Sequence, residues 1–194
     1  ASGFRLDVGC GGNKQLGFVG MDKRQVKGAD GKDIVDIVHD IEIFPWPIDD
    51  NSVLDIMCSH IIEHIKPWLM IDLMNEMWRV MKPAGQLIIS MPYGVSFGYV
   101  QDPTHCNACN EATWQYYDPR FPLYGIYRPK PWLISMGFPQ WRINGNLEVL
   151  MRKLTEADGE RVAKGELPKD NPIPVESKKM EIQRSALRAG HPTK

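Results

Sequence analysis

The chain has 194 residues, of which 43% are apolar and 24% are charged, and its formal net charge is −1 with histidine neutral. This composition is that of an ordinary globular protein and excludes wholesale disorder. The balance of acidic and basic residues argues against a broad nucleic-acid-binding surface, which requires clustered cations. A chain of this length suits one domain with a short appendage.

The sequence contains no sign of membrane insertion or secretion. No stretch approaches the ~20 apolar residues that cross a bilayer. The first residues, Ala1 to Arg5, lack the basic and then apolar pattern of a secretion signal, which predicts a cytoplasmic protein. The four cysteines are too few for the disulfide framework of a secreted protein, so we expect reduced thiols.

Five short apolar runs, each bounded by turn residues, predict strands at residues 4–8, 17–21, 33–40, 53–58 and 86–91. The first run stops at a glycine-rich turn. The second stops at Asp22 and the third at Asp40. The third run is rich in β-branched residues, which favour strands.

The spacing of polar residues predicts a helix over residues 68–81. Asp72, Asn75 and Arg79 recur at helical spacing, Pro67 stands where a helix begins, and residues 83–85 (Pro-Ala-Gly) end it. Strands that alternate with a helix and are apolar on both faces are typical of a parallel sheet covered by helices. We therefore predict an α/β protein with a mostly parallel sheet and helices on both faces.

Half of the aromatic residues fall between 114 and 141, among several prolines that forbid long regular elements. Two interpretations stay open, an aromatic-packed surface loop and a lid or substrate pocket. After this segment, Asn144-Gly145 between two apolar runs predicts a hairpin and hence an antiparallel terminal strand.

The last part of the chain, residues 155–194, is charged, contains prolines and has no aromatic residue. We interpret it as a tail, with a candidate helix over 178–189, whose removal costs little stability. The predicted domain is thus residues 1–154.

The glycine turn and the acidic strand ends together predict a nucleotide-type ligand. Gly9 and Gly11 let the backbone approach a ligand where a Cβ would clash. Asp22, at the end of the next strand, is placed to accept both ribose hydroxyls of an adenosine. Asp40 follows the third strand and is expected to reach an adenine amine, while Ile41 supplies an apolar flank.

At these residues the chain resembles class I S-adenosylmethionine-dependent methyltransferases. Residues 6–13 (LDVGCGGN) are similar to the first motif of that family, and the short path to Asp22 resembles its small, type 11-like bacterial and phage members, in which the first helix is nearly absent. The resemblance covers about residues 4–118 and continues through the segments 39–42, 44–47, 50–52, 58–65, 79–85 and 102–105.

The resemblance implies S-adenosyl-L-methionine as cofactor, a Rossmann-like fold, and methyl transfer to an acceptor of unknown class. It implies that Asp7, Gly9, Cys10 and Gly11 surround the methionine part of the cofactor. In the same way, Asp22 holds the ribose, Asp40 and Ile41 flank the adenine, and Ser59 and His60 close the pocket near the methyl donor. Two departures are Gly12-Asn13-Lys14 in place of the usual helix start and Leu54 in place of a phenylalanine.

The acceptor side is expected in the loop after the fifth strand, because such folds bind ligands at the carboxyl ends of their parallel strands. This loop, residues 92–109, holds the candidate catalytic residues Tyr93, Asp102 and His105. His105 is the best proton acceptor there, since an imidazole titrates near neutral pH. Its alternative role is to order the loop by bonding to Asp102 or to a backbone carbonyl.

Other motifs predict competing functions. His60-Ile61-Ile62-Glu63-His64 matches the H-x-x-E-H pattern of inverted zinc peptidases, but a third ligand helix is missing. His105, Cys106 and Cys109 offer soft ligands without the second pair that a structural zinc site needs, so no metal ligand is assigned.

The glycine turn lacks the third glycine that a nicotinamide dinucleotide requires. A non-catalytic, cofactor-binding partner or regulatory subunit is the remaining alternative, because a fold alone does not fix activity.

Overall fold

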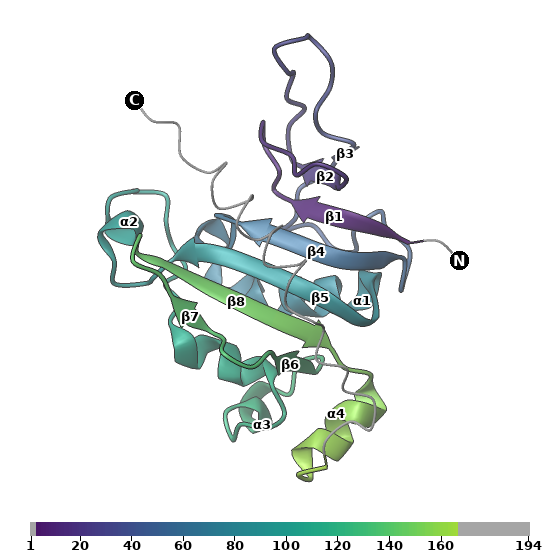
Figure 1. Ribbon diagram of the computed structural model, residues 1–194, viewed down its shortest axis with the longest axis vertical. Coiled ribbons are helices and arrows are strands. Elements are labelled where there is room, and N and C mark those ends of the chain that lie inside the picture. Colours follow the sequence, from purple (N-terminus) through teal and green to yellow (C-terminus); the bar gives the residue numbers. More distant parts are fainter. Residues whose placement is uncertain (1–2, 167–194) are drawn as a thin grey trace.

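The computed structural model describes residues 3–166, in which eight strands form one open sheet (Figure 1). The strands are β1 (Phe4–Val8), β2 (Val19–Asp22), β3 (Ile37–Val38), β4 (Val53–Ser59), β5 (Met81–Pro92), β6 (Trp132–Ile134), β7 (Gln140–Trp141) and β8 (Asn146–Lys153). Their order is β3-β2-β1-β4-β5-β8-β6, with β7 also paired to β8.

Strands β1 to β5 are parallel, whereas β8 runs antiparallel to β5, and β6 and β7 run antiparallel to β8. This topology confirms the predicted α/β class, the mostly parallel sheet and the antiparallel terminal strand. The hairpin is confirmed as well. Its turn closes between Arg142 and Asn146, and Gly145 there has a φ of +85°.

The helices are α1 (Met70–Val80), α2 (Phe97–Val100), α3 (Tyr124–Tyr127) and α4 (Glu156–Ala163), with 3-10 turns at Ile62–His64, Pro67–Leu69 and Glu111–Tyr117. Helix α1 confirms the helix predicted from polar spacing, and Pro67 opens the 3-10 turn that precedes it. Its Leu73 and Met77 are buried in one core with Leu6 and Leu87 of the sheet. Helix α1 thus covers one face, behind β4 and β5 in Figure 1.

The connection from β1 to β2 contains no helix, as the resemblance implied. Strand β3 is shorter than the predicted run 33–40. The reason is the Gln25 side chain, which accepts from the Val35 N–H at 3.1 Å and donates to its carbonyl at 2.9 Å. Residues 33–35 therefore fold back on residues 25–27 through a bridge between Lys27 and Asp33, and only Ile37 and Val38 join the sheet.

The aromatic segment divides between the core and a cavity. Trp114, Tyr117 and Trp132 are buried in the main core, whereas Trp141 lines the large cavity described below. Phe121 and Phe138 line a further cavity of about 350 Å³. The segment therefore combines core packing with cavity walls, and neither of the two open interpretations describes all of it.

Helix α4 begins just after the predicted domain boundary and belongs to the folded unit. Its Val162 is 3% exposed and packs with Leu133 and Leu154 at the β6 edge of the sheet. The candidate helix over 178–189 lies outside the described residues. Within residues 3–166, no helix has the length and apolar character that a bilayer crossing requires.

Candidate functional site

The carboxyl ends of β1 and β4 border a cavity of about 320 Å³. Its lining residues are Asp7, Gly9, Cys10, Gly11, Gly12, Asn13, Gln15, Met57, Ser59 and His60. The structure therefore brings together most of the residues predicted to surround a cofactor, including the pair from the end of β4.

Two glycines shape this cavity for different reasons. Gly9 has a φ of +69°, and a Cβ at that position would stand 2.0 Å from Cδ1 of Ile61, so only glycine fits. Gly11 has a φ of +49°, but a Cβ there would meet nothing within 4 Å. The space beside Gly11 is thus open to a ligand that approaches the backbone.

Asp7 is buried at the floor of the cavity. Its Oδ2 accepts a hydrogen bond of 2.8 Å from the Gln15 N–H. Burial raises the pKa of Asp7 to about 6, although the Gln15 bond and the charge of Lys14 oppose this shift. Burial and the neighbouring Asp7 also raise the pKa of the Cys10 thiol to about 11, which leaves Cys10 protonated and unreactive at neutral pH.

Asp22 does not line this cavity, but it is hydrogen-bonded to the glycine turn that does. Its Oδ2 accepts from the Gly11 N–H at 3.0 Å, and its Oδ1 accepts from the Arg24 N–H at 3.2 Å. Asp40 and Ile41 follow β3, on the far side of β2, and do not line this cavity. Asp40 accepts from the Glu42 N–H, and the Ile41 carbonyl accepts from the Trp46 indole.

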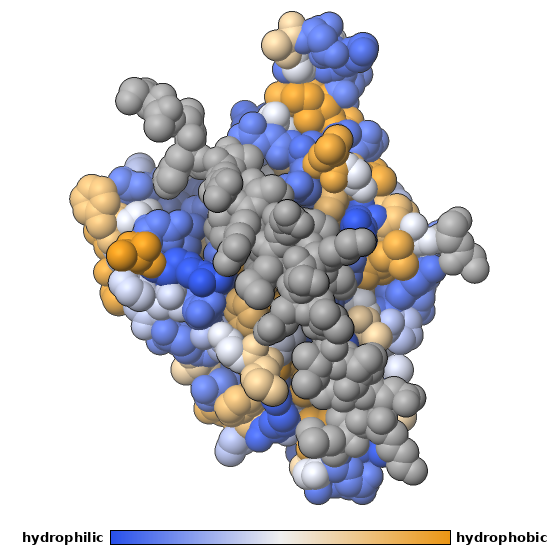
Figure 2. All heavy atoms as spheres, viewed as in Figure 1, coloured by the Kyte–Doolittle hydropathy of each residue, from blue (hydrophilic) through white to orange (hydrophobic). Residues whose placement is uncertain are grey.

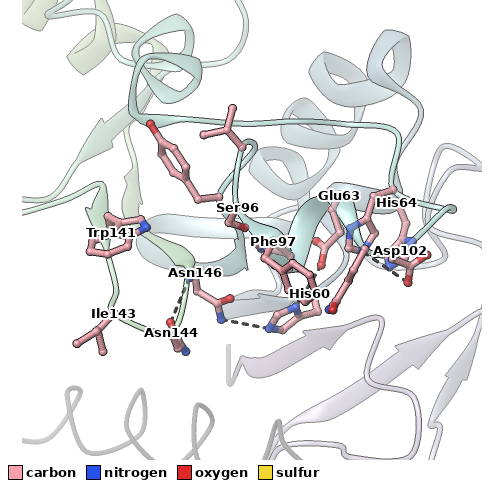
Figure 3. Close-up of a pocket in the computed structure, with 17 residues that line it drawn as sticks. His60, Glu63, His64, Ser96, Phe97, Asp102, Trp141, Ile143, Asn144 and Asn146 are labelled. Carbon is pink, nitrogen blue, oxygen red and sulfur yellow. Dashed lines mark hydrogen bonds and ion pairs between the residues drawn. The ribbon is translucent and has the colours of Figure 1, made fainter.

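A second and larger cavity of about 920 Å³ opens beside the first (Figure 3). Its lining residues are His60, Glu63, His64, Pro92, Tyr93, Val95, Ser96, Phe97, Gly98, Gln101, Asp102, His105, Trp141, Ile143, Asn144, Gly145 and Asn146. All three predicted acceptor-side residues, Tyr93, Asp102 and His105, are among them. His60 lines both cavities and is therefore the wall that they share.

The rim of the large cavity is apolar. Val95 and Phe97 are each 82% exposed, and Ile143 is 97% exposed. In the surface view, apolar side chains gather at the edge formed by α2 and the β7–β8 turn (Figure 2). A ligand that enters here meets an apolar rim before it reaches the polar floor.

His105 is held by a backbone carbonyl. Its Nδ1 lies 2.8 Å from the carbonyl oxygen of Tyr99, and a carbonyl only accepts, so Nδ1 carries a proton. Asp102 stands 3.8 Å from Nε2, which is beyond hydrogen-bond distance. Hydrogen bonds from Thr104 hold the pKa of Asp102 below its usual value.

The hydroxyl of Tyr93 donates to Oε2 of Glu111 at 3.0 Å. This bond, more than any other contact, raises the pKa of Tyr93 above its usual value. Tyr93 is thus held in place at the cavity wall as a protonated phenol.

Glu63 is the site residue that sequence reasoning left unassigned. Its side chain is 1% exposed, and neither carboxylate oxygen has a hydrogen-bond partner among the described residues. The H-x-x-E-H pattern was the signal that could have found it. That pattern does not form the helix of a zinc peptidase, because His60 has a φ of +55° and residues 62–64 form a 3-10 turn.

The two cysteines of the loop do not join His105 as ligands. The Cys106 thiol lies against the carbonyls of His64 and Ile65, at 3.5 and 3.4 Å, and the Cys109 thiol is buried beside Asn107.

No family model and no curated protein matches this sequence. Solved structures do match. A SAM-dependent methyltransferase from Archaeoglobus fulgidus is 16% identical, with a TM-score of 0.55 over 79% of this chain and 87% of that one. A SAM-dependent methyltransferase from Methanosarcina mazei is 14% identical, with a TM-score of 0.53 over 80% of this chain and 94% of that one.

The [4+2]-cyclase SpnF is 16% identical, with a TM-score of 0.51 over 79% of this chain and 76% of that one. The fold is therefore shared by proteins of different activity, and identities this low show the fold alone. Sheet order, the glycine turn and these likenesses together establish that the chain has the class I S-adenosylmethionine-dependent methyltransferase fold.

Proposed function

We propose that this protein transfers a methyl group from S-adenosyl-L-methionine to an acceptor that binds in the large cavity. The single observation that carries the proposal is the position of His60, which separates a glycine-lined cavity from the larger one. Ligands in these two cavities would lie next to each other at His60, and group transfer between them requires such proximity.

The residues of the small cavity fit the cofactor. The buried carboxylate of Asp7 suits a cationic amino group, and binding would restore the charge that burial disfavours. The open space beside Gly11 admits a ligand against the backbone, and Asp22 retains acceptor capacity for ribose hydroxyls. Ser59 and His60 close the side that faces the acceptor. Asp40 and Ile41 belong to the proposed adenine end.

Bound S-adenosylmethionine supplies an activated methyl group on a sulfonium. The protein then has to align the acceptor, and alignment of this kind contributes up to about 7–11 kcal/mol in favourable cases. An acceptor that must lose a proton also needs a base. His105 is the proposed base, because its Nδ1–H is bound to Tyr99 and the lone pair of the neutral ring is therefore on Nε2. Tyr93 and Asp102 complete the proposed acceptor side.

The test uses the full chain and two measurements. Calorimetry with S-adenosylhomocysteine should give one binding event, and incubation with methyl-labelled S-adenosylmethionine and a cell extract should label a product. Labelling should disappear with excess S-adenosylhomocysteine. Absence of heat would overturn the proposal. Binding without any labelled product would favour the non-catalytic cofactor-binding partner instead.

A further inference from the structure

Three side chains with metal-ligand atoms converge at the floor of the large cavity. Glu63, His64 and His105 each offer one ligand atom, and these atoms lie within 4.8 Å of one another. The two imidazoles meet edge to face, with ring centroids 4.7 Å apart. Figure 3 shows Glu63 and His64 side by side, with Asp102 next to them.

Hydrogen bonds fix which nitrogen of each ring can bind an ion. In His105, the Tyr99 carbonyl takes the Nδ1 proton, so the lone pair of the neutral ring is on Nε2. In His64, Nδ1 lies 3.1 Å from the hydroxyl oxygen of Thr104. That hydroxyl donates its own proton to Asp102 at 2.7 Å, so it only accepts from His64 and leaves Nε2 of His64 free as well.

This arrangement of outer partners is typical of metal-binding histidines. A ligating imidazole usually donates its second N–H to a carbonyl, a carboxylate or a group bonded to one, which orients the ring. Here His105 donates its second N–H to the Tyr99 carbonyl. His64 donates to the Thr104 hydroxyl, which is itself bonded to Asp102.

Glu63 supplies an independent indication of a missing partner. Its carboxylate is almost completely buried, lines the cavity, and has no hydrogen-bond partner within residues 3–166. The Nδ1 atom of His60 is 3.2 Å from Oε1, but not in hydrogen-bonding geometry. A buried carboxylate without a partner is costly, and a cation beside it would remove that cost.

We propose that Glu63, His64 and His105 bind one divalent transition-metal ion. Two imidazoles and one carboxylate are a ligand set that first-row ions such as Zn²⁺, Fe²⁺ and Mn²⁺ accept with coordination positions left open. Mg²⁺ and Ca²⁺ prefer oxygen ligands and are expected to bind weakly. Zinc ligands stand about 2.0–2.2 Å from the ion, so side-chain shifts on the order of 1 Å would bring all three ligand atoms to bonding distance of one ion.

The ion site does not depend on the proposed methyl transfer, although it occupies the acceptor side of the same cavity. In the ion-loaded protein His105 is a ligand, and this role replaces that of a free base. An ion there would polarise an acceptor oxygen as a Lewis acid.

The experiment measures Zn²⁺ binding to the untagged full chain, without S-adenosylmethionine, by competition with a chromophoric chelator. One Zn²⁺ per chain is expected, and Co²⁺ should give a visible absorption spectrum that Zn²⁺ abolishes. Glu63→Gln and His64→Gln should each weaken Zn²⁺ binding more than 100-fold. Thr104→Val keeps all three ligands but loses the His64 support, and should weaken binding about 10–100-fold.

His39→Gln is the matched control, because His39 is a half-buried histidine outside both cavities whose ring bonds to the Ile43 carbonyl. Its Zn²⁺ affinity should equal that of the unmodified protein. Without metal, Glu63→Gln should unfold at the same or a higher temperature, since it removes a buried charge. Equal Zn²⁺ affinity for all variants, absence of stoichiometric binding, or a metal-free Glu63→Gln protein that is less stable would each overturn the proposal.

Discussion

His60 places its Nδ1 atom 3.2 Å from the buried Oε1 of Glu63, and its Nε2 atom 3.3 Å from the amide nitrogen of Asn146. Both contacts come from a residue with a φ of +55°, a conformation that residues other than glycine seldom adopt. This conformation lets the His60 ring stand between the two cavities, where the end of β4, the 3-10 turn and the β8 strand meet. The His60 ring between the two cavities thus has a neighbour on each side.

Asp22→Ala should weaken S-adenosylhomocysteine binding at least tenfold. Hydrogen bonds to a charged acceptor contribute about 1.5–3 kcal/mol each, and the change also releases the Gly11 N–H from its partner. Calorimetry measures the affinity. Asp33→Ala is the matched control, since Asp33 is exposed and pairs only with Lys27 on the surface. Equal affinity of the two variants would remove Asp22 from the site.

Asp7→Asn should stabilise the ligand-free protein at neutral pH while weakening its affinity for the cofactor. Because burial raises the pKa of Asp7 from its ordinary value of 3.8 to about 6, the folded state keeps a proton that the unfolded chain releases. This group's contribution to stability therefore falls as the pH rises from about 4 to about 6. At neutral pH, ionised Asp7 should therefore lower the free energy of unfolding by an amount on the order of 3 kcal/mol.

Thermal unfolding of Asp7→Asn and the unmodified protein at several pH values checks this prediction. The two melting temperatures should nearly coincide at pH ~4 and separate above pH ~6, with the variant higher. A variant that melts lower than the unmodified protein at neutral pH would contradict the assigned cause, which is burial of the charge.

Gly11→Ala should lower both the stability of the protein and its affinity for S-adenosylhomocysteine, for two different reasons. Its positive φ costs an alanine about 1–2 kcal/mol, and the new methyl group occupies the open space beside the turn. S-adenosylhomocysteine affinity should fall at least tenfold. Gly31→Ala is the control, because Gly31 also has a positive φ and open surroundings but lies outside the cavity. It should show a similar stability loss with unchanged affinity.

Truncation should locate the end of the folded unit. A chain that stops after residue 154 loses α4, and exposing Val162 and its partners alone costs about 1.5–3 kcal/mol. A chain that stops after residue 166 keeps these contacts and should melt close to the full chain, in line with the polar composition of the remainder. Equal melting temperatures for the two truncated chains would show that α4 contributes no stability.

The sequence by itself determined strands β1, β2, β4 and β5, helix α1 and the glycine turn. These features are local: apolar runs alternate with breakers, polar residues recur at helical spacing, and a glycine at Gly9 marks a backbone turn that a side chain would block. For the same reason the hairpin at Gly145 could be predicted correctly.

Only the tertiary structure decided where β3 begins, which aromatic residues are buried, and what Glu63 faces. The Gln25 side chain competes with the sheet for the backbone of Val35, and no local pattern reports that competition. The ligand atoms of Glu63 and His64 meet that of His105 because the loop after β5 returns to the end of β4, where the Cys106 N–H bonds to the Glu63 carbonyl at 2.8 Å. Such contacts join residues far apart in the chain, so residue spacing alone carries no information about them.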